Sequence, residues 1–234
     1  MTTTRAPTPI LAAELAPLID HTLLRADAVE AELRRHCAEA VRHGFCSVCV
    51  NPANVALVAR ALQGSGVRTC SVVAFPLGAT LSADKAAEAA NAVRRGAAEV
   101  DMVINLGALR EGRHSDVRDD IAAVRRACSS AVLKVIIEAC LLSDEEKRTA
   151  CLLSAEAGAD FVKTSTGFST GGATVADVAL MRAAVGTTLG VKASGGIRTL
   201  EEAQALVAAG ASRIGASSGV ALVTSSGVAP GSSY

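Results

Sequence analysis

Lysine and carboxylate side chains recur inside apolar, strand-like runs of the 234-residue chain. Lys163 stands in FVKTST, Lys192 in GVKASGG and Asp101 in EVDMVIN, while Lys134 and Glu138 share VLKVIIEA. A charged group inside a protein is costly unless it is paired or used. Three lysines and two acids in four consecutive runs therefore indicate either a structural ion-pair cluster or an amine site with charge partners. We favour the amine site.

The chemistry expected of such a site is imine formation by a lysine. An ordinary lysine amine has a pKa of about 10.4, so at pH 7 fewer than about one in a thousand is neutral and nucleophilic. A second ammonium nearby, together with desolvation, lowers that pKa. Lys163 and Lys192 lie 29 positions apart, which places them on neighbouring strands of a repeating strand–helix chain. Asp101 is a candidate for proton transfer. These physical arguments do not decide whether Lys163, Lys192 or Lys134 is the nucleophile.

Glycine-rich segments follow the last two strand-like runs, SGGIRT at 194–199 and GASSG at 215–219. A third segment, TSTGFSTGG, begins directly after Lys163. Glycine lets backbone N–H groups approach a ligand closely, and the helix N-terminus that follows favours negative charge. In (β/α)₈ barrels, phosphate commonly binds in the loops after strands seven and eight. We therefore predict a phosphate site here rather than tight turns alone.

These residues need a scaffold, and the sequence predicts eight strands. Their expected ranges are 18–24, 45–51, 68–75, 99–105, 132–139, 161–166, 190–196 and 213–218. Ala-, Glu- and Arg-rich segments with helical spacing separate most of them. Strict alternation implies a parallel sheet, and eight units favour a closed (β/α)₈ TIM barrel of the α/β class. The rival is a doubly wound open sheet, which is disfavoured because no G-x-G-x-x-G opens the first unit.

Composition predicts one barrel domain over residues 1–234, with a short N-terminal extension at 1–16 and a flexible tail at about 224–234. Half the residues are hydrophobic and 2% are aromatic, so we expect a large core built from Val, Ile, Leu and Ala, the residue types that fill barrel interiors. Lys plus Arg equals Asp plus Glu at 23 each, which gives no electrostatic reason to expect nucleic acid or an anionic membrane as partner. The absence of a secretory signal or a long apolar run predicts a cytoplasmic protein.

The seven cysteines are odd in number and lie mostly in apolar runs, as expected of buried thiols in a reducing compartment. Cys46 and Cys49 have C-x-x-C spacing, but strand alternation would point their thiols to opposite faces. No second pair follows at metal-binding spacing. We therefore expect neither a metal nor a cofactor, and Cys49 taken alone is predicted to be a core residue.

Five motifs carry a family resemblance: LIDHTLL, EVDMVINLGAL, FVKTSTGF, GVKASGGIRT and GASSG, between about Asp20 and Ser218. In their order and spacing the chain resembles the deoxyribose-phosphate aldolases. The resemblance implies reversible cleavage of 2-deoxy-D-ribose 5-phosphate to D-glyceraldehyde 3-phosphate and acetaldehyde, without a metal. It also implies that Lys163 forms the Schiff base, that Lys192 perturbs its amine, and that Asp101 moves protons through water.

Further roles follow from the same resemblance. Asp20 and Thr22 would contact substrate hydroxyls, Cys49 would lie near the site, and Tyr234 would reach back to assist proton transfer, as in part of the family. Family members are often dimers or tetramers, so we expect a homo-oligomer whose ligand is a small phosphorylated sugar or aldehyde. Phosphate contacts would fall on Gly167, Gly195, Gly196, Arg198, Gly215, Ser217 and Ser218.

The chain departs from the family pattern at two places. Phe168 stands where some relatives carry a lysine that helps to hold phosphate, so binding should rest more on Arg198 and the backbone. The segment after Ser218 is short and polar, which predicts a weak or absent final helix.

Three other functions remain open on the sequence. One is another Schiff-base barrel aldolase, of the transaldolase-like or fructose-phosphate type. Another is a barrel that senses phosphorylated sugars without catalysis. The last is a structural oligomerisation module, which nothing in the sequence favours.

Overall fold

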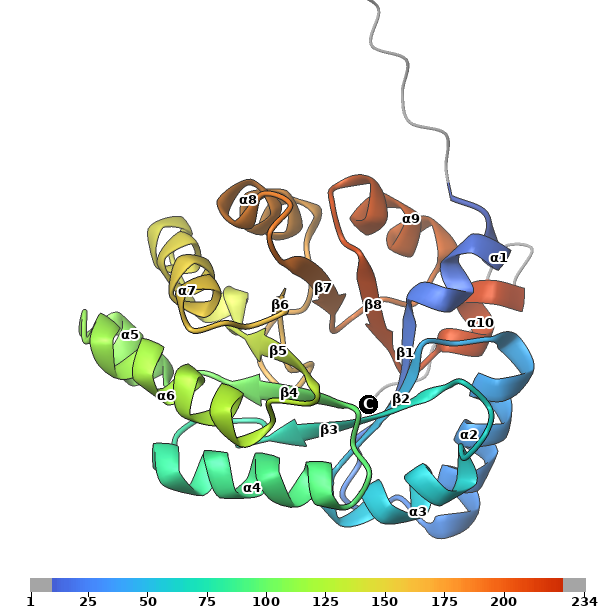
Figure 1. Ribbon diagram of the computed structural model, residues 1–234. Coiled ribbons are helices and arrows are strands. Elements are labelled where there is room, and N and C mark those ends of the chain that lie inside the picture. The colour runs from blue at the N-terminus through green and yellow to red at the C-terminus, as the bar shows by residue number, and fades with distance from the viewer. Residues whose placement is uncertain (1–9, 225–234) are drawn as a thin grey trace, which may run out of the picture.

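The computed structural model describes residues 10–224 and contains the predicted closed barrel. Its eight parallel strands pair in chain order, and β8 pairs with β1 to close the ring (Figure 1). The prediction of a (β/α)₈ barrel is therefore confirmed. The strands are β1 (Ile19–Leu23), β2 (Ser47–Val50), β3 (Arg68–Val73), β4 (Glu99–Val103), β5 (Val132–Ile136), β6 (Phe161–Lys163), β7 (Gly190–Ser194) and β8 (Arg213–Ala216).

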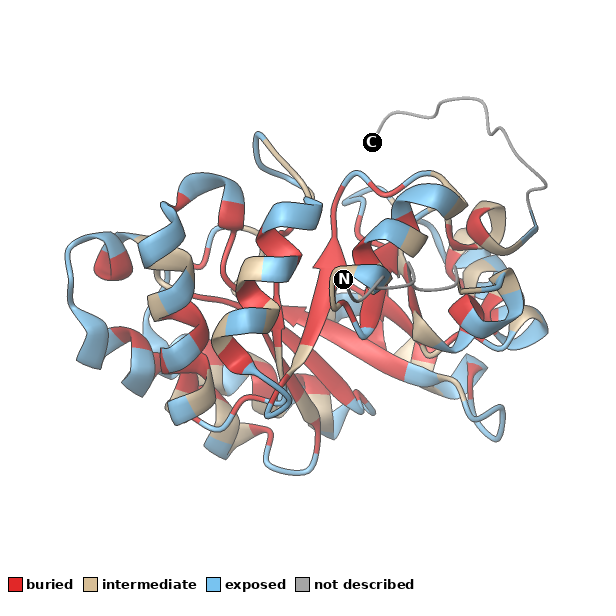
Figure 2. Ribbon diagram, turned by 90° about the horizontal axis from the view of Figure 1, so that it is seen from above, coloured by how far each residue is buried: buried red, intermediate tan, exposed pale blue. Residues whose placement is uncertain are grey.

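Helices surround the ring of strands and turn their exposed faces outward (Figure 2). Ser143 and Thr199 cap two of them, and each hydroxyl accepts a backbone N–H from the glutamate three positions on. The helices are α1 (Ala12–Leu15), α2 (Glu30–His43), α3 (Val55–Ala61), α4 (Ser82–Arg94), α5 (Leu106–Arg110), α6 (His114–Ala127), α7 (Asp144–Glu156), α8 (Val175–Val185), α9 (Leu200–Ala208) and α10 (Gly219–Thr224), with short 3₁₀ turns η1 (Ala16–Leu18), η2 (Pro52–Asn54) and η3 (Ala139–Leu141).

The predicted strands run too far at their carboxyl ends. The fifth was expected to reach residue 139, but β5 ends at Ile136, and Glu138 has a left-handed φ of 50°. The sixth was expected to reach residue 166, but β6 ends at Lys163. Apolar and β-branched residues continue past these ends because the following loops are themselves buried. The chain leaves the sheet early to build the loops at the carboxyl end of the barrel.

The core is built mainly from Val, Ile, Leu and Ala, as predicted. It includes strand residues such as Val100, Leu133 and Ile214, which pack with the helices. A separate small apolar cluster consists of Leu24, Cys49, Cys70, Val72 and Phe75. The composition predicts the residue types of the core but not the face of each strand on which they lie.

Both ends of the described chain are more ordered than expected. Part of the predicted extension at 1–16 is helical, since α1 ends at Leu15, whose side chain is fully buried. The final helix, predicted to be weak or absent, is present as α10 and buries Leu222. Tyr234 and the rest of the predicted tail beyond residue 224 lie outside the described residues.

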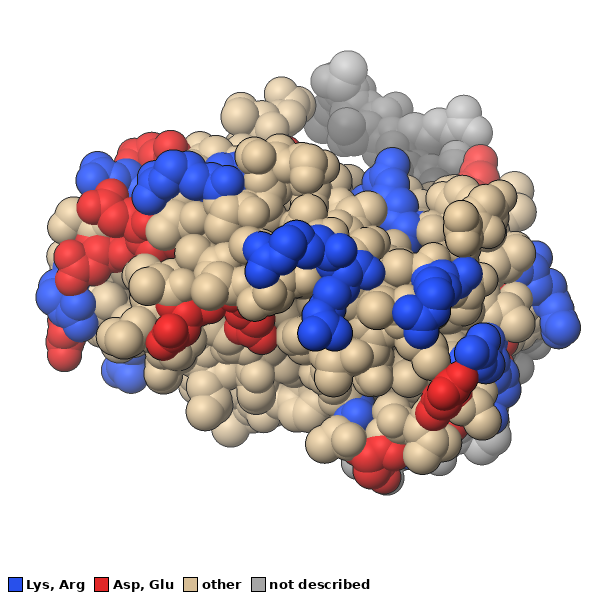
Figure 3. Space-filling model, turned by 60° about the horizontal axis from the view of Figure 1, so that its bottom comes forward, with Lys and Arg blue, Asp and Glu red and all other residues tan. Residues whose placement is uncertain are grey.

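Charged side chains of both signs are spread over the face shown in Figure 3, with uncharged surface between them. Within residues 10–224, no helix combines the length and apolar character needed to cross a membrane.

Two stacked histidines join α2 to β1. The rings of His21 and His36 lie 4.1 Å apart at 12°, and His21 Nε2 is 2.9 Å from Glu39 Oε2. Burial, and then the neighbouring charge of His21, lower the pKa of His36 to about 4. Burial also lowers the pKa of His21, although Glu39 opposes the shift. Both rings are therefore neutral in the folded protein at pH 7.

We expect the protein to lose stability as the pH falls from about 6.5 to about 4. The unfolded histidines take up protons near pH 6.5, whereas the folded ones resist until lower pH, so acid favours unfolding. Urea unfolding at several pH values measures this slope. His36→Gln should flatten it, and His114→Gln, at an exposed position, should not. Equal slopes in all three proteins would contradict the assignment.

Candidate active site

A cluster of buried charges occupies the barrel axis. In the described chain it contains four cationic side chains, from Lys134, Lys163, Lys192 and Arg213, each at most 6% exposed. Three fully buried carboxylates face them, from Asp20, Glu99 and Asp101. Because alternate residues of a barrel strand point inward, strands β1, β4, β5, β6, β7 and β8 each place members of this set on the axis.

Asp101 lies at the centre of the cluster and contacts three ammonium groups. Its Oδ2 accepts hydrogen bonds from Lys163 Nζ at 2.8 Å and from Lys192 Nζ at 2.7 Å. Its Oδ1 accepts from Lys134 Nζ at 2.7 Å. Burial alone would raise the pKa of Asp101, but the three ammonium groups hold it well below its usual value. Asp101 is therefore ionised in this arrangement.

The other two lysines are held as cations by carboxylates. Lys192 Nζ also lies 2.6 Å from Asp20 Oδ2, and Lys134 Nζ lies 2.5 Å from Glu99 Oε2. Burial alone would lower the pKa of both lysines, but the carboxylates, Asp101 foremost, raise both above the ordinary value. Neither amine is therefore suited to act as a neutral nucleophile.

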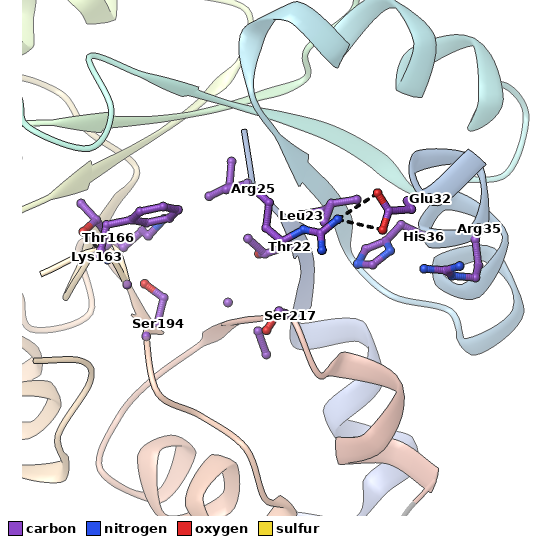
Figure 4. A pocket seen from close by; sticks show the side chains of 16 residues that line it. Thr22, Leu23, Arg25, Glu32, Arg35, His36, Lys163, Thr166, Ser194 and Ser217 are labelled. Atoms are coloured by element: carbon purple, nitrogen blue, oxygen red, sulfur yellow. Dashed lines mark hydrogen bonds and ion pairs between the residues drawn. The ribbon is translucent and has the colours of Figure 1, made fainter. Parts of the chain in front are cut away.

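Lys163 differs from these two lysines because it borders a cavity. Lys163 and Lys192 are direct partners in the register of β6 and β7. Lys134 and Lys192 are fully buried, whereas Lys163 lines a cavity of about 290 Å³ at the carboxyl end of the strands. Figure 4 shows Lys163 and Thr166 on one side of this cavity and the side chains of α2 on the other. A small molecule in the cavity can therefore reach the Lys163 amine.

Two loops at the cavity are locked together by hydrogen bonds. Thr164 Oγ1 donates to Ser194 O at 3.2 Å and accepts from Ser194 N at 3.1 Å, and Ser194 Oγ donates to Ser165 O at 2.6 Å. Gly195 has a φ of 88°, and a Cβ there would lie 3.3 Å from Gly167 Cα. Glycine is thus needed where the loops after β6 and β7 meet.

Gly215 makes room for Lys192. A Cβ at this position would come within 3.0 Å of Lys192 Cε and 2.9 Å of Ser194 Cβ. Any side chain at residue 215 would therefore displace the Lys192 ammonium group from Asp101.

Glu138, predicted as a strand charge, instead anchors the loop after β6. It is 3% exposed, and its carboxylate accepts hydrogen bonds from Thr166 N at 3.2 Å and Thr166 Oγ1 at 2.5 Å. Thr166 Oγ1 in turn accepts from Phe168 N at 3.0 Å. The acid holds the segment between Lys163 and Phe168 rather than joining the axial cluster.

The predicted substrate contacts separate into two groups. Thr22, Gly167, Gly195, Gly215 and Ser217 line the cavity, and their contacts with a ligand stay predictions. Gly196 and Ser218 belong to the same loops but do not line this cavity, so their roles also remain predictions.

Two of the residues predicted to contact the substrate do not line the cavity. Asp20 is fully buried beneath it, where its Oδ1 accepts from Ser47 Oγ and Arg213 Nη1, each at 2.7 Å. Arg198 has an exposed side chain outside the cavity lining. Contacts of these two residues with a ligand stay predictions.

Cys49 faces the barrel interior, where its donor atom lies within 4.8 Å of those of Cys70 and Asp101. The Cys70 thiol donates to Asp101 Oδ1 at 3.2 Å, and Lys134 Nζ lies 3.4 Å from the same sulfur. A divalent cation at this position would have to displace a buried ammonium, so the donor set is better suited to hold Asp101. Cys49 packs in the small apolar cluster, as expected of a core residue.

Sequence reasoning missed several participants. Glu99 and Arg213 begin their strands and share an ion pair of 2.9 Å. Alternate residues of a strand point the same way. Glu99 lies two positions before Asp101 and Arg213 two positions before Gly215, so both could have been predicted to lie inside the barrel. Arg25 lies in the loop after β1, at the carboxyl end of the barrel strands, where site residues are expected. Arg35 carries no such signal because its placement depends on how α2 packs.

A lysine beside a carboxylate and a second ammonium, at the cavity of a (β/α)₈ barrel, is the arrangement of a lysine-dependent carbon–carbon lyase. The model of the DeoC/LacD aldolase family matches residues 15–225. The chain belongs to this family, and it is an aldolase.

Two relatives of high similarity are both named deoxyribose-phosphate aldolase. A deoxyribose-phosphate aldolase of Rhodospirillum rubrum is 65% identical over 212 residues, covering 91% of this chain and 89% of the relative. One from Geobacillus is 58% identical over 210 residues, covering 89% and 94%.

Solved structures agree with this similarity. A crystal structure titled as a putative deoxyribose-phosphate aldolase of Coccidioides immitis has a TM-score of 0.90 at 44% identity, covering 93% of this chain and 87% of that one. A deoxyribose phosphate aldolase of Aeropyrum pernix, titled as tetrameric, has a TM-score of 0.85 at 37% identity, covering 91% and 90%.

Proposed function

We propose that this chain is a class I aldolase that reversibly cleaves 2-deoxy-D-ribose 5-phosphate to D-glyceraldehyde 3-phosphate and acetaldehyde. The observation that carries the mechanism is the position of Lys163. Of the three lysines that contact Asp101, Lys163 lines the cavity, while Lys134 and Lys192 are fully buried beneath it. The family and its named relatives support the choice of substrate.

The reaction begins when the neutral Lys163 amine attacks the C1 aldehyde of the open-chain sugar. A C–N bond forms, the carbinolamine loses water, and a protonated imine results. A base takes the proton from the C3 hydroxyl as the C2–C3 bond breaks. The bonding electrons move into the iminium to give an enamine, and C3 becomes the aldehyde of glyceraldehyde 3-phosphate. Protonation of C2 and hydrolysis of the imine then release acetaldehyde and the free amine.

Lys163 is the lysine of the cluster with the fewest carboxylate partners. Four buried cations face three buried carboxylates, so the cluster carries one excess formal positive charge. Lys134 and Lys192 each contact two or more carboxylates, whereas Lys163 contacts Asp101 alone among the described residues. The lysine that faces the cavity is therefore also the one least held by carboxylates.

Asp101 would move protons between the intermediates. While three ammonium groups surround it, Asp101 is a weak base. Once Lys163 is neutral or part of a carbinolamine, one of these contacts loses its charge and the carboxylate accepts a proton more readily. A water molecule between Asp101 and the substrate would carry the proton.

Two predictions from the sequence accompany this proposal. A homo-oligomer is supported by the Aeropyrum pernix relative, whose title describes a tetramer. A cytoplasmic location remains the prediction made from the sequence.

Product analysis tests the substrate and the need for a metal. Purified protein given 2-deoxy-D-ribose 5-phosphate should release glyceraldehyde 3-phosphate and acetaldehyde in equal amounts, and EDTA should leave the rate unchanged. The expected independence of metal follows from the imine, which acts as the electron sink that a metal would otherwise provide. Loss of activity with EDTA, restored by added zinc, would contradict the mechanism. Cleavage of fructose or transaldolase substrates in its place would show that the protein acts on a different sugar.

A further inference from the structure

Two of the three cationic side chains that line the cavity, Arg25 and Arg35, lie on the same side as α2 (Figure 4). The ionisable groups that line the cavity are those of Lys163, Arg25, Arg35 and Glu32, together with His36, which burial keeps neutral. Their formal sum is positive by two charges. On the opposite wall, Phe168 is 53% exposed and rests edge-on against Phe75.

The two arginines differ in how firmly they are held. Arg25 Nη2 donates to both carboxylate oxygens of Glu32, at 2.8 and 2.9 Å. Arg35 has one weak partner in the described chain, Glu39 Oε1 at 3.8 Å from its Nε, and its side chain is 62% exposed. Figure 4 shows Arg25 extending across the cavity to Glu32, and Arg35 directed from α2 toward His36. The donors of Arg35 are therefore available to a ligand.

We propose that Arg35 and Arg25 provide the cationic contact to the phosphate of the bound sugar, an inference that rests on the proposed function. The loops around Gly195 and Gly215 offer backbone N–H groups, but a phosphate dianion also needs a counter-charge. Phe168 cannot supply it, and Arg198 lies outside the cavity. The planar guanidinium fork matches phosphate geometry.

Glu32 opposes phosphate binding in this arrangement. It holds Arg25 by a bidentate pair and places a negative charge on the cavity wall. A bound phosphate therefore competes with Glu32 for Arg25. Removing the charge of Glu32 should strengthen phosphate binding, which is the opposite of what damage to the site would cause.

The test is the synthesis reaction with acetaldehyde as donor and two acceptors, D-glyceraldehyde 3-phosphate and D-glyceraldehyde. Arg35→Met and Arg25→Met should each raise the KM for the phosphorylated acceptor roughly five- to tenfold and leave the KM for the unphosphorylated one unchanged. Inorganic phosphate should inhibit both variants less than the unaltered protein. Arg34→Met is the matched control, since Arg34 lies on the same helix, is 59% exposed and pairs with Glu30 away from the cavity.

Two substitutions that should strengthen phosphate binding distinguish the loss of a charge from a structural defect. Glu32→Gln keeps an oxygen for the Val29 N–H that Glu32 now accepts, and should lower the KM for the phosphorylated acceptor. Phe168→Lys should restore much of the phosphate affinity lost in Arg35→Met, by supplying the missing charge from the opposite wall. A purely structural defect at residue 35 would not respond to Phe168→Lys.

Equal KM values for Arg35→Met and Arg34→Met, or equal losses with both acceptors, would overturn the inference. Trapping of acetaldehyde with borohydride distinguishes this failure from failure of the proposed function, because acetaldehyde carries no phosphate. The arginine variants should form the reduced acetaldehyde adduct as readily as the unaltered protein does. If the unaltered protein does not trap acetaldehyde, the Schiff-base mechanism itself is wrong.

Discussion

Lys163→Ala should reduce cleavage of 2-deoxy-D-ribose 5-phosphate by roughly ten-thousandfold or more, because no other amine that contacts Asp101 lines the cavity. Lys134 and Lys192 would still contact Asp101, so the cluster keeps three carboxylates and three cations and the fold should survive. Steady-state cleavage rates measure the loss, and thermal unfolding checks the fold.

Lys147→Ala is the control for Lys163→Ala. Lys147 lies on α7, where it pairs with Asp144 and Asp177 outside the cavity. Its loss should leave cleavage unchanged. If Lys163→Ala kept more than about one part in a hundred of the activity while folded, another residue would have to be the nucleophile.

Lys192→Met should slow cleavage roughly a hundredfold and move the pH profile of kcat/KM upward by about one unit or more. Lys192 is one of the three ammonium groups that hold the pKa of Asp101 low, so without it the carboxylate stays protonated to a higher pH. The measurement is kcat/KM across the range from pH 6 to pH 10, taken roughly at unit steps.

The substitution also removes one cationic partner of Asp20, which keeps Arg213 at 2.7 Å and Lys134 at 3.6 Å, so the fold should lose stability but survive. Combining Lys192→Met with Asp20→Asn removes one charge of each sign from the cluster. The double variant has the same excess charge as the unaltered protein, so it should regain stability and its pH profile should move back toward the original position. A profile of Lys192→Met alone that is identical to that of the unaltered protein would contradict the electrostatic role of Lys192.

Lys163, Lys192 and Asp101 could be predicted as a group because of two regularities. One is the repeat of the strand–helix unit, and the other is the alternation of side chains along a strand. Lys163 and Lys192 are one strand–helix unit apart, and the structure pairs them directly in register. Asp101 was expected in the same ring and contacts both amines. Charge burial cannot rank the three lysines from sequence alone. In the structure, exposure to the cavity ranks them.

Residues whose position depends on packing between distant elements could not be predicted. Arg35 reaches the cavity because α2 packs against β1, a contact that no local pattern specifies. Arg198 was placed among the phosphate contacts by the family resemblance, and in the structure its exposed side chain does not line the cavity. Glu138 looked like a strand residue because hydrophobic sequence continues past the end of β5.

The most direct test of the account is to trap the imine and map it. Protein incubated with acetaldehyde and reduced with borohydride should carry N-ethyl-lysine at Lys163, found by peptide mass mapping. The chain has five lysines, so each can be scored separately. Lys163 should be modified to a much greater extent than Lys147, and Lys192 should not be modified. Modification confined to surface amines, or located on Lys192, would contradict the claim that the cavity lysine forms the covalent bond.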